Sequence, residues 1–371
     1  MNKKSLLLLT MISSMQLIKA DAQDVASKFI DSVIIDRAET FTRVANAVGI
    51  SIGLYRLGEN YTYHFGTISK GLELRPTDST LYPIASITKT FTGLLLAQAS
   101  TEGKLKLDND VREYLDGNYP NLEYNGQPVR LYHLVSHVSR LPFNISPRVE
   151  LPGYTRADFF NDLREVKIDT IPGVKFQYSN AAAQLAGYVL ENIYKESFES
   201  LVKTKIAIPL NMRHTYLTLT PEKHKLLATG YTANGSTDTS NYAAMGAAGG
   251  LKSNVSDLLK YLRAQLKANS EAIKLTRRES WGFDMTNGSR YSCGLNWQII
   301  RKPDGTQRIF QDGNVPGYSS KMIILPEEDM GIILLSNSFL PEQLSELADG
   351  ILEALSELKN TISECHQVRK K

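Results

Sequence analysis

The sequence predicts an α+β fold in which an antiparallel β-sheet is flanked by helices and a mostly helical region is inserted between its strands. Strand-like alternation of apolar and polar residues occurs near the start of the chain, at 48–66, and again near its end, at 291–337. The region at about 104–235 instead has helical patterns broken by prolines. Terminal hairpins around a helical middle are typical of one composite sheet with a helical insertion.

Residues 1–22 have the pattern of a secretory signal peptide. Lys3 and Lys4 precede an apolar run that ends at Leu17, and Ala20-Asp21-Ala22 is an A-x-A cleavage signal. The run is shorter than the roughly 20 apolar residues that span a membrane, and no later stretch reaches that length. We therefore expect residues 23–371 to form a single domain that is exported, periplasmic or secreted, without a stable membrane anchor.

The mature chain is expected to be nearly neutral. Removing residues 1–22 takes away three lysines and one aspartate, so the formal charge falls from +3 to +1. This balance gives no electrostatic reason to expect a nucleic-acid partner. Cys293 and Cys365 could form a disulfide or remain two thiols, but they cannot make a Cys-rich zinc site.

The expected elements follow from local patterns. Alternation predicts strands over 48–57 and 61–66, joined at Gly58, after a first helix over 24–36. Apolar periodicity predicts a buried helix that ends near Gly103, and further helices over 179–194 and 197–206. A helix capped by Asn254 or Ser256 comes next. Strands over 291–300, 306–310, 319–325 and 330–337 and a helix over 341–358 complete the chain.

Two short motifs are better explained by structure than by chemistry. Ser51 lies in a G-x-S-x-G pattern, but it is inside a predicted strand, whereas a nucleophile elbow needs a strand that turns into a helix. His133 and His137 are four residues apart, as in a zinc site. No glutamate follows His133 and no third ligand is evident, so two structural histidines are favoured and no metal is expected.

The pattern S-x-x-K occurs at Ser86, Ser200 and Ser356, and only Ser86 opens a strongly apolar helix, "SITKTFTGLLLAQAS". Free N–H groups and the helix dipole favour developing negative charge at that end. Lys89 follows three residues later on the same face, where burial would lower its pKa toward that of a general base. A capping serine with an outward-reaching lysine is the alternative on this stretch alone.

Tyr178-Ser179-Asn180 stands where a loop passes into a helix. The tyrosine could exchange protons if cationic Lys89 stabilised its phenolate, and the Asn180 amide could bind substrate. By itself such a tripeptide is commonly a turn and a helix cap.

Ser86-x-x-Lys89 followed by Tyr178-Ser179-Asn180 resembles the motifs of the serine β-lactamase and penicillin-binding-protein superfamily. The resemblance is to its class C-like branch, which includes class C β-lactamases, DD-carboxypeptidases, D-aminopeptidases and esterases of β-lactamase fold. The segments "HLVSHVSRLP", "GAAGGLKSNVSDLLKYL" and "NVPGYSSKMIILPEEDMGIILLSN" are similar to family segments too. The resemblance implies a β-lactamase/transpeptidase-like fold with the site between sheet and helices.

The resemblance also implies roles for individual residues. Ser86 would be the acylated nucleophile, Lys89 its base, and Tyr178 the residue that shuttles protons and activates the deacylating water. Asn180 would orient Lys89 and the substrate amide. The backbone N–H groups of Ser86 and Asn314 would form the oxyanion hole. No metal or organic cofactor is needed for this chemistry.

The chain departs from the family at two places. Gln311-Asp312-Gly313 stands where the family has K-T-G or H-x-G. Gly313 still lets a substrate lie close, but Gln311 offers only neutral hydrogen bonds and Asp312 adds a negative charge, which disfavours carboxylate-bearing β-lactams. Arg140 replaces a usual glycine and is expected to alter a loop rather than the chemistry.

We therefore expect an exported serine hydrolase that acts through an acyl-enzyme on Ser86. Its partner would be a small-molecule or peptide substrate with an ester, amide or peptide bond, such as a β-lactam or a D-amino-acid peptide. The alternative is a non-catalytic protein of the same fold that binds cell-wall peptide. The altered third motif favours this alternative, and the retained Ser86, Lys89 and Tyr178 oppose it.

Overall fold

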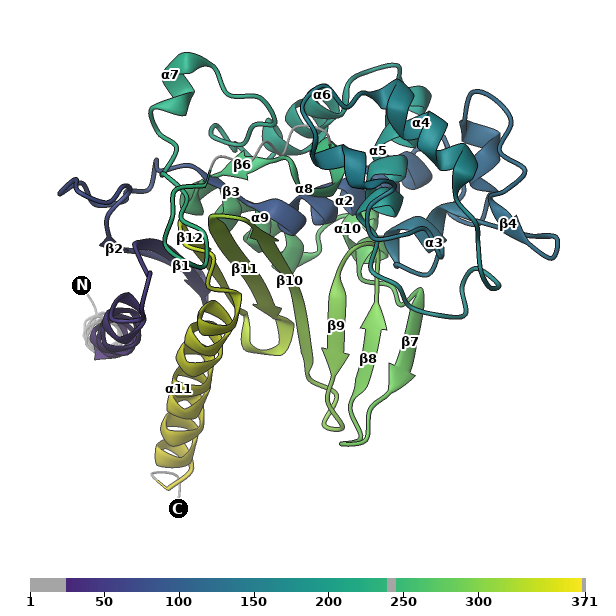
Figure 1. The fold of residues 1–371 in the computed structure, drawn as a ribbon. Helices are drawn as coiled ribbons and strands as arrows, with labels where there is room; N and C mark the ends of the chain where they lie inside the picture. Colours follow the sequence, from purple (N-terminus) through teal and green to yellow (C-terminus); the bar gives the residue numbers. More distant parts are fainter. Residues whose placement is uncertain (1–24, 239–244, 369–371) are drawn as a thin grey trace, which may run out of the picture. The chain divides into compact units, whose positions relative to one another are not determined.

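The computed structural model describes residues 25–238 and 245–368. The predicted signal peptide therefore lies outside the described residues, and its removal stays a prediction. The chain divides into two compact units: Ala45–Leu344, and the terminal segments Met1–Val44 with Ser345–Lys371. The terminal unit consists of a helix over 25–42, longer than predicted, and most of α11 (Pro341–Val368), whose Gly350 packs against Arg37 (Figure 1). That residues 23–371 form a single domain stays a prediction.

The larger unit contains an eight-stranded sheet in the order β2-β1-β12-β11-β10-β9-β8-β7, with antiparallel pairing between neighbours (Figure 1). β1 (Gly49–Arg56) and β2 (Glu59–Gly66) form the N-terminal hairpin. β1 also pairs with the last strand, β12 (Met330–Ser336), with Ile50 opposite Ser336. The strands from both ends of the chain therefore share one sheet, which confirms the predicted fold class.

The C-terminal strands differ in detail from the prediction, which missed β7 (Trp281–Asp284). The single strand expected over 291–300 is wrong: β8 (Arg290–Cys293) and β9 (Gln298–Arg301) are separated by a turn. Gly294 N–H donates to the Trp297 carbonyl at 2.9 Å across this turn. A short apolar pattern in the sequence does not distinguish one strand from two shorter strands joined by a tight turn.

β10 (Gln307–Val315) runs five residues beyond its predicted end and pairs with β11 (Tyr318–Leu325). The stretch Gln311–Val315 is therefore strand, and only Pro316 and Gly317 form the connection to β11. Gly317 has φ +89°, a conformation that glycine adopts without steric cost.

The other helices lie between β2 and β7 in the sequence, with the short strands β3 to β6 among them. α2 is buried on all sides from Thr88 to Ala97, and this stretch includes Lys89 and three threonines as well as apolar residues. Asn254 caps α9 by accepting a hydrogen bond from the Asp257 N–H, so of the two predicted caps, Asn254 and Ser256, it is Asn254 that caps the helix. The bounds are α2 (Thr88–Thr101), α3 (Leu131–Val135), α4 (Arg156–Glu165), α5 (Asn180–Tyr194), α6 (Phe198–Val202), a π-helical turn (Lys203–Ala207), α7 (Pro221–His224), α8 (Gly246–Gly249), α9 (Val255–Lys267) and α10 (Glu271–Thr276), with β3 (Tyr82–Pro83), β4 (Glu123–Tyr124), β5 (Gln127–Pro128) and β6 (Lys252–Ser253).

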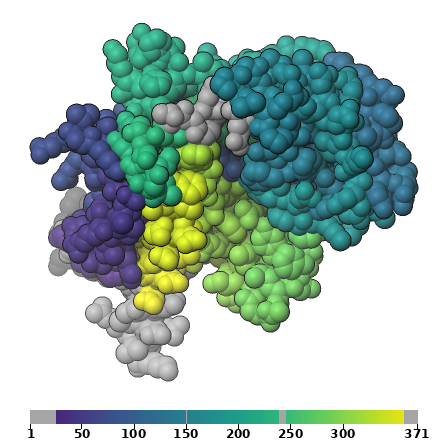
Figure 2. Space-filling view, viewed as in Figure 1, coloured from purple at the N-terminus to yellow at the C-terminus, as the bar shows by residue number. Residues whose placement is uncertain are grey.

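Helices approach the sheet where its strands carry glycine. A Cβ on Gly53 of β1 would lie 2.6 Å from Val255 of α9, and one on Gly331 of β12 would lie 2.7 Å from Leu262. The segment before α5 meets the other end of the sheet, where Trp281 Nε1 of β7 donates to the Val174 carbonyl at 3.2 Å. Figure 2 shows the teal surface of this helical region bordering the green surface of β7–β9. Within residues 25–238 and 245–368, no helix is long and apolar enough to cross a membrane.

Candidate active site

Ser86 lies in a sharp turn at the start of α2. The turn is a 3₁₀ segment, Ala85–Ile87, in which Ala85 adopts φ +44°. This left-handed conformation costs free energy for a residue with a Cβ, so contacts with the surrounding residues must stabilise it. They do so closely: a Cβ on Gly313 of β10 would lie 2.2 Å from the Ile84 carbonyl, to which Ser320 Oγ donates at 3.0 Å. Strands β10 and β11 therefore fix the turn that presents Ser86.

Lys89 is hydrogen-bonded directly to Ser86. Its Nζ donates to Ser86 Oγ at 2.9 Å and to the Ala248 carbonyl of α8 at 2.6 Å. The side chain is fully buried, and burial lowers its pKa from the ordinary 10.5 to about 7. Desolvation disfavours the charged form of an amine, so the neutral form of Lys89 is accessible near pH 7. A neutral amine at this distance can take the proton of the Ser86 hydroxyl.

Tyr178, the residue before the cap of α5, completes a cluster with these two side chains. Lys89 Nζ lies 4.9 Å from the centroid of the Tyr178 ring. Burial raises the pKa of Tyr178 to about 12, while hydrogen bonds from Ser86 and then Gln311 act in the opposite direction. The phenol is therefore neutral at pH 7. The structure thus brings together Ser86, Lys89 and Tyr178, which the sequence separates by 92 positions.

His137 holds the segment that carries Tyr178. Its ring lies 4.2 Å from the Tyr178 ring, centroid to centroid, and its Nδ1 accepts the Ser179 N–H at 3.2 Å. Burial, and secondarily the charge of Lys89, lower the pKa of His137 to about 3. The imidazole is therefore neutral and packs against Tyr178. The expectation of a structural histidine fits this geometry, although the sequence did not indicate its contact with Tyr178.

Asn180 faces a partner that the sequence did not reveal. Its Nδ2 donates to Asn144 Oδ1 at 3.1 Å, and its backbone N–H donates to the Phe143 carbonyl at 2.7 Å. In the described chain the hydrogen bonds of Lys89 Nζ run to Ser86 and Ala248 rather than to Asn180. The only sequence signal for Asn144 was its place just after the "HLVSHVSRLP" segment.

The third wall of the site is the end of β10. Gln311 Nε2 donates to Tyr178 Oη at 3.3 Å, which puts Gln311 beside the cluster. β9 pairs with β10 only as far as Phe310, whereas β11 accompanies it to Val315. The stretch from Gln311 to Val315, including Asn314, therefore has a strand partner on one side only, so backbone donors of its other edge are available to a ligand.

Asp312 does not present a free charge to the site. Its Oδ1 is 2.8 Å from Nζ of Lys321, a β11 side chain only 6% exposed. Successive strand residues point to opposite faces, and Gln311 and Gly313 contact Tyr178 and the Ser86 turn. Asp312 thus lies on the face away from Ser86, where Lys321 neutralises it. This ion pair depends on the register of β10 against β11, which no short sequence pattern indicates.

Ser51, His64 and Asp78 form a Ser-His-Asp arrangement that is inaccessible to substrate. Ser51 Oγ is 2.9 Å from His64 Nδ1, and His64 Nε2 is 3.1 Å from Asp78 Oδ1. Ser51 Oγ also lies 3.0 Å from Tyr82 Oη. Ser51 is fully buried inside β1, so no substrate can reach it. The group ties β1, β2 and β3 together, in agreement with the structural interpretation of the G-x-S-x-G pattern.

The remaining candidates also have structural partners. His133 Nδ1 accepts the Arg130 N–H at 2.9 Å, and burial lowers the pKa of His133 to about 4. No group of three or more His, Cys, Asp or Glu side chains that could hold a metal occurs within the described ranges. Cys293 is a free, buried thiol whose pKa burial raises to about 12. The side chain of Cys365 lies outside the described residues.

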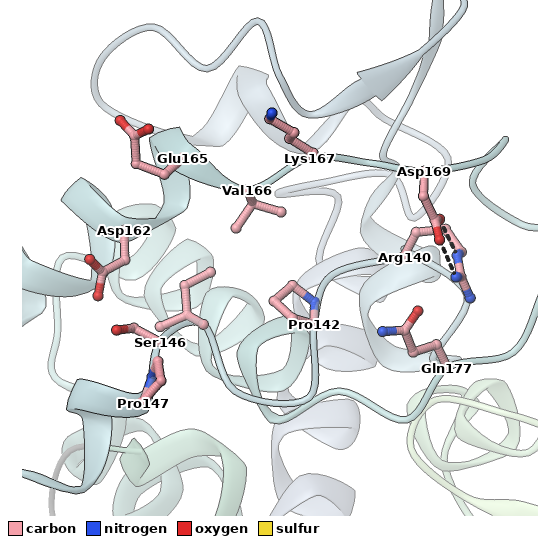
Figure 3. Close-up of a pocket in the computed structure, with 11 residues that line it drawn as sticks. Arg140, Pro142, Ser146, Pro147, Asp162, Glu165, Val166, Lys167, Asp169 and Gln177 are labelled. Carbon is pink, nitrogen blue, oxygen red and sulfur yellow. Dashed lines mark hydrogen bonds and ion pairs between the residues drawn. The ribbon is translucent and has the colours of Figure 1, made fainter.

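A pocket of about 440 Å³ lies behind the loop that leads to Tyr178 (Figure 3). Arg140, which replaces the family's usual glycine, forms one wall through two hydrogen bonds to Asp169, at 2.8 and 2.7 Å. Arg140 keeps a glycine-like φ of +65°. Pro142 and Gln177 line the pocket, but Ser86, Lys89 and Tyr178 do not. Arg140 therefore shapes a loop beside the cluster, as the sequence predicts.

Comparisons with known proteins agree with this geometry. The family model described as Beta-lactamase matches residues 36–356. The D-alanyl-D-alanine-carboxypeptidase/endopeptidase AmpH of Escherichia coli K12 is 24% identical, over 96% of this chain and 97% of its own. The Protein flp of Staphylococcus aureus N315 is 27% identical over 78% of this chain, which spans about three fifths (59%) of that relative.

Solved structures have the same fold. A Beta-Lactamase/D-Alanine Carboxypeptidase from Pseudomonas syringae superposes with a TM-score of 0.77 at 20% identity, covering 87% of this chain and 98% of its own. The corresponding protein from Yersinia pestis, complexed with citrate, has a TM-score of 0.76 at 25% identity, covering 90% and 99%. The predicted resemblance is confirmed. The chain belongs to the Beta-lactamase family.

Proposed function

We propose that this chain is an exported serine hydrolase that cleaves an ester, amide or peptide bond through an acyl-enzyme on Ser86. The observation that carries the proposal is the 2.9 Å contact between Lys89 Nζ and Ser86 Oγ, made by a buried lysine with a pKa of about 7. Of the three S-x-x-K patterns, Ser200 instead bonds Glu196 on the surface, so its lysine has no such role.

In the proposed acylation, neutral Lys89 takes the Ser86 proton as Oγ attacks the substrate carbonyl. The oxyanion is held by the backbone N–H groups of Ser86 and Asn314, each contributing about 3 to 4 kcal/mol to transition-state stabilisation. Tyr178 gives its proton to the leaving atom as the carbon–heteroatom bond breaks, and Lys89 returns a proton to Tyr178. In deacylation the same groups deprotonate a water that attacks the ester carbonyl, and Ser86 regains its proton.

The residues beside the cluster favour an uncharged substrate group where β-lactams carry a carboxylate. Gln311 is neutral, Lys321 is paired with Asp312, and Arg140 is paired with Asp169. Within residues 25–238 and 245–368, a substrate carboxylate at this position therefore finds no unpaired cation beside Gln311 for a charge-assisted hydrogen bond. Phe143, 56% exposed and 6.2 Å from the Tyr178 ring between centroids, offers an apolar contact for the acyl group. Asn180 and Asn144 supply amide groups for the substrate amide.

The relative AmpH is a D-alanyl-D-alanine-carboxypeptidase/endopeptidase, which supports a D-amino-acid peptide as one substrate class. Export is proposed from the signal-peptide pattern of residues 1–22. A peptide whose C-terminal residue is amidated or extended would avoid the missing carboxylate contact. We therefore expect an esterase or peptidase specificity rather than efficient β-lactam hydrolysis.

Labelling by a fluorescent fluorophosphonate tests the proposal. Wild-type protein and Ser200→Ala, a matched S-x-x-K control, are expected to label at equal rates, and Ser86→Ala is expected not to label. Labelling of Ser86→Ala at the wild-type rate would overturn the assignment. Tight binding of a cell-wall peptide without product, by a protein that does not label, would instead support the non-catalytic alternative.

A further inference from the structure

We propose that Gln298 and Tyr291 are positioning residues that act through Gln311 to keep the Tyr178 oxygen a hydrogen-bond acceptor, so that the Tyr178 proton points toward the leaving group. The inference rests on the proposed function, because it assigns the origin of the proton that Tyr178 delivers. It concerns three side chains on β8, β9 and β10 that lie outside the Ser86, Lys89 and Tyr178 cluster.

The orientation of the Gln311 amide is fixed at one end by the backbone. Gln311 Nε2 lies 3.1 Å from the Asp312 carbonyl, and a carbonyl oxygen can only accept a hydrogen bond. The group that faces it must therefore be the NH₂. The same nitrogen lies 3.3 Å from Tyr178 Oη. Tyr178 Oη thus accepts from Gln311, and its own hydrogen has to point elsewhere.

The other end of the Gln311 amide is held by a series of hydrogen bonds between side chains, which all have the same donor-to-acceptor direction. Because Nε2 faces Asp312, Gln311 Oε1 must accept, and Gln298 Nε2 donates to it at 3.5 Å. Gln298 Oε1 must then accept, and Tyr291 Oη donates to it at 2.9 Å. Each link leaves the next amide with one allowed orientation.

Cys293 supplies the start of the chain. Its Sγ lies 3.8 Å from Tyr291 Oη, and the buried thiol keeps its hydrogen at neutral pH. Thiol sulfur is a weak acceptor, so the Tyr291 hydrogen points to the amide oxygen of Gln298, which is the stronger acceptor. The rings of Phe283 and Phe176 lie 5.4 and 6.2 Å from the Tyr291 ring, between centroids, and hold it in place.

The consequence concerns proton transfer. A neutral tyrosine has one hydrogen, and with Gln311 donating to its oxygen that hydrogen is available to Ser86 or to the leaving atom. The same donation stabilises the phenolate that forms when the proton leaves. A basic leaving group needs this proton, whereas p-nitrophenolate departs without it. Loss of the chain should therefore slow hydrolysis only for poor leaving groups.

The experiment compares kcat/KM for a p-nitrophenyl ester and the ethyl ester of the same acyl group. Gln298→Met keeps the shape but removes both hydrogen bonds, and Tyr291→Phe removes only the hydroxyl. We expect each to lose about three- to tenfold on the ethyl ester, as for one hydrogen bond, and less than about twofold on the p-nitrophenyl ester. Tyr178→Phe should show the same selectivity with a loss of about 100-fold or more.

Gln307→Met is the matched control, because it makes the same change on β10 away from Tyr178, and it should alter neither ester. Equal losses on both esters in Gln298→Met and Tyr291→Phe would mean a merely structural role and overturn the inference, as would no loss on either. If Gln298→Met does not fold, Tyr291→Phe decides alone. Turnover of either ester by Ser86→Ala would instead refute the proposed function.

Discussion

Replacing Lys89 by arginine removes the base while keeping a cation of similar length at the site. An arginine guanidinium cannot lose its proton in a protein, so it cannot accept the one from Ser86. The buried Lys89 amine has a pKa of about 7, so its neutral form is accessible near pH 7. A lysine with the ordinary pKa of 10.5 would be neutral in only about one molecule in 3000 at that pH, since each pH unit is a factor of ten.

We therefore expect Lys89→Arg to slow acylation of Ser86 by about 1000-fold, within the range of general-base catalysis. The assay is the rate of fluorophosphonate labelling from pH 5.5 to 9.5. The wild-type rate should rise with pH and level off above about pH 7, where the base is neutral. A flat wild-type profile between pH 5.5 and 9.5, or an arginine variant within tenfold of wild type, would refute the role given to Lys89.

Three further changes follow from the same geometry. Lys89→Met should raise the free energy of unfolding by about 1 to 3 kcal/mol at pH 7. The pKa of Lys89 is lower in the folded than in the unfolded protein, so the stability of the wild type rises between pH 7 and 10.5. Urea titrations should therefore show the stability difference between Lys89→Met and wild type shrinking over that range. Gln311→Lys should raise nitrocefin hydrolysis by about tenfold, because a charge-assisted bond replaces a neutral one, with Gln307→Lys as control; efficient nitrocefin hydrolysis by the native protein would contradict this. Ser51→Ala should label like wild type yet lose about 1 to 3 kcal/mol of stability, because the Tyr82 hydroxyl loses a buried hydrogen-bond partner. Loss of labelling in a folded Ser51→Ala variant would indicate that Ser51, His64 and Asp78 take part in catalysis.

The cluster of Ser86, Lys89 and Tyr178 was predicted from local chemistry at each motif together with the order of the motifs, which resembles that of a known family. The apolar helix that begins with Ser-x-x-Lys favoured a buried lysine over an outward-reaching one, and burial is the cause of the low pKa of Lys89. The alternation at both chain ends predicted the shared sheet for a similar reason, since half-buried strands need partners. The local signals for these features are short patterns, each within one helical turn or one strand.

The features that were missed depend on register and on long-range contacts. The Lys321 partner of Asp312 requires β10 and β11 to pair with these two residues opposite each other, which no short window specifies. The Asn144 partner of Asn180 comes from a loop 36 positions earlier. The end of β10 was misplaced because glycine and polar residues in "QDGNV" indicate a turn locally, while pairing with β11 makes them a strand.

The central claim, an acyl-enzyme on Ser86, can be measured directly. Turnover of a p-nitrophenyl ester is quenched with acid, and the protein is mapped by peptide mass spectrometry. We predict one added acyl group per chain, on the peptide that contains Ser86, formed no more slowly than steady-state turnover. Steady turnover without an acyl adduct, or an adduct confined to another peptide, would contradict the account.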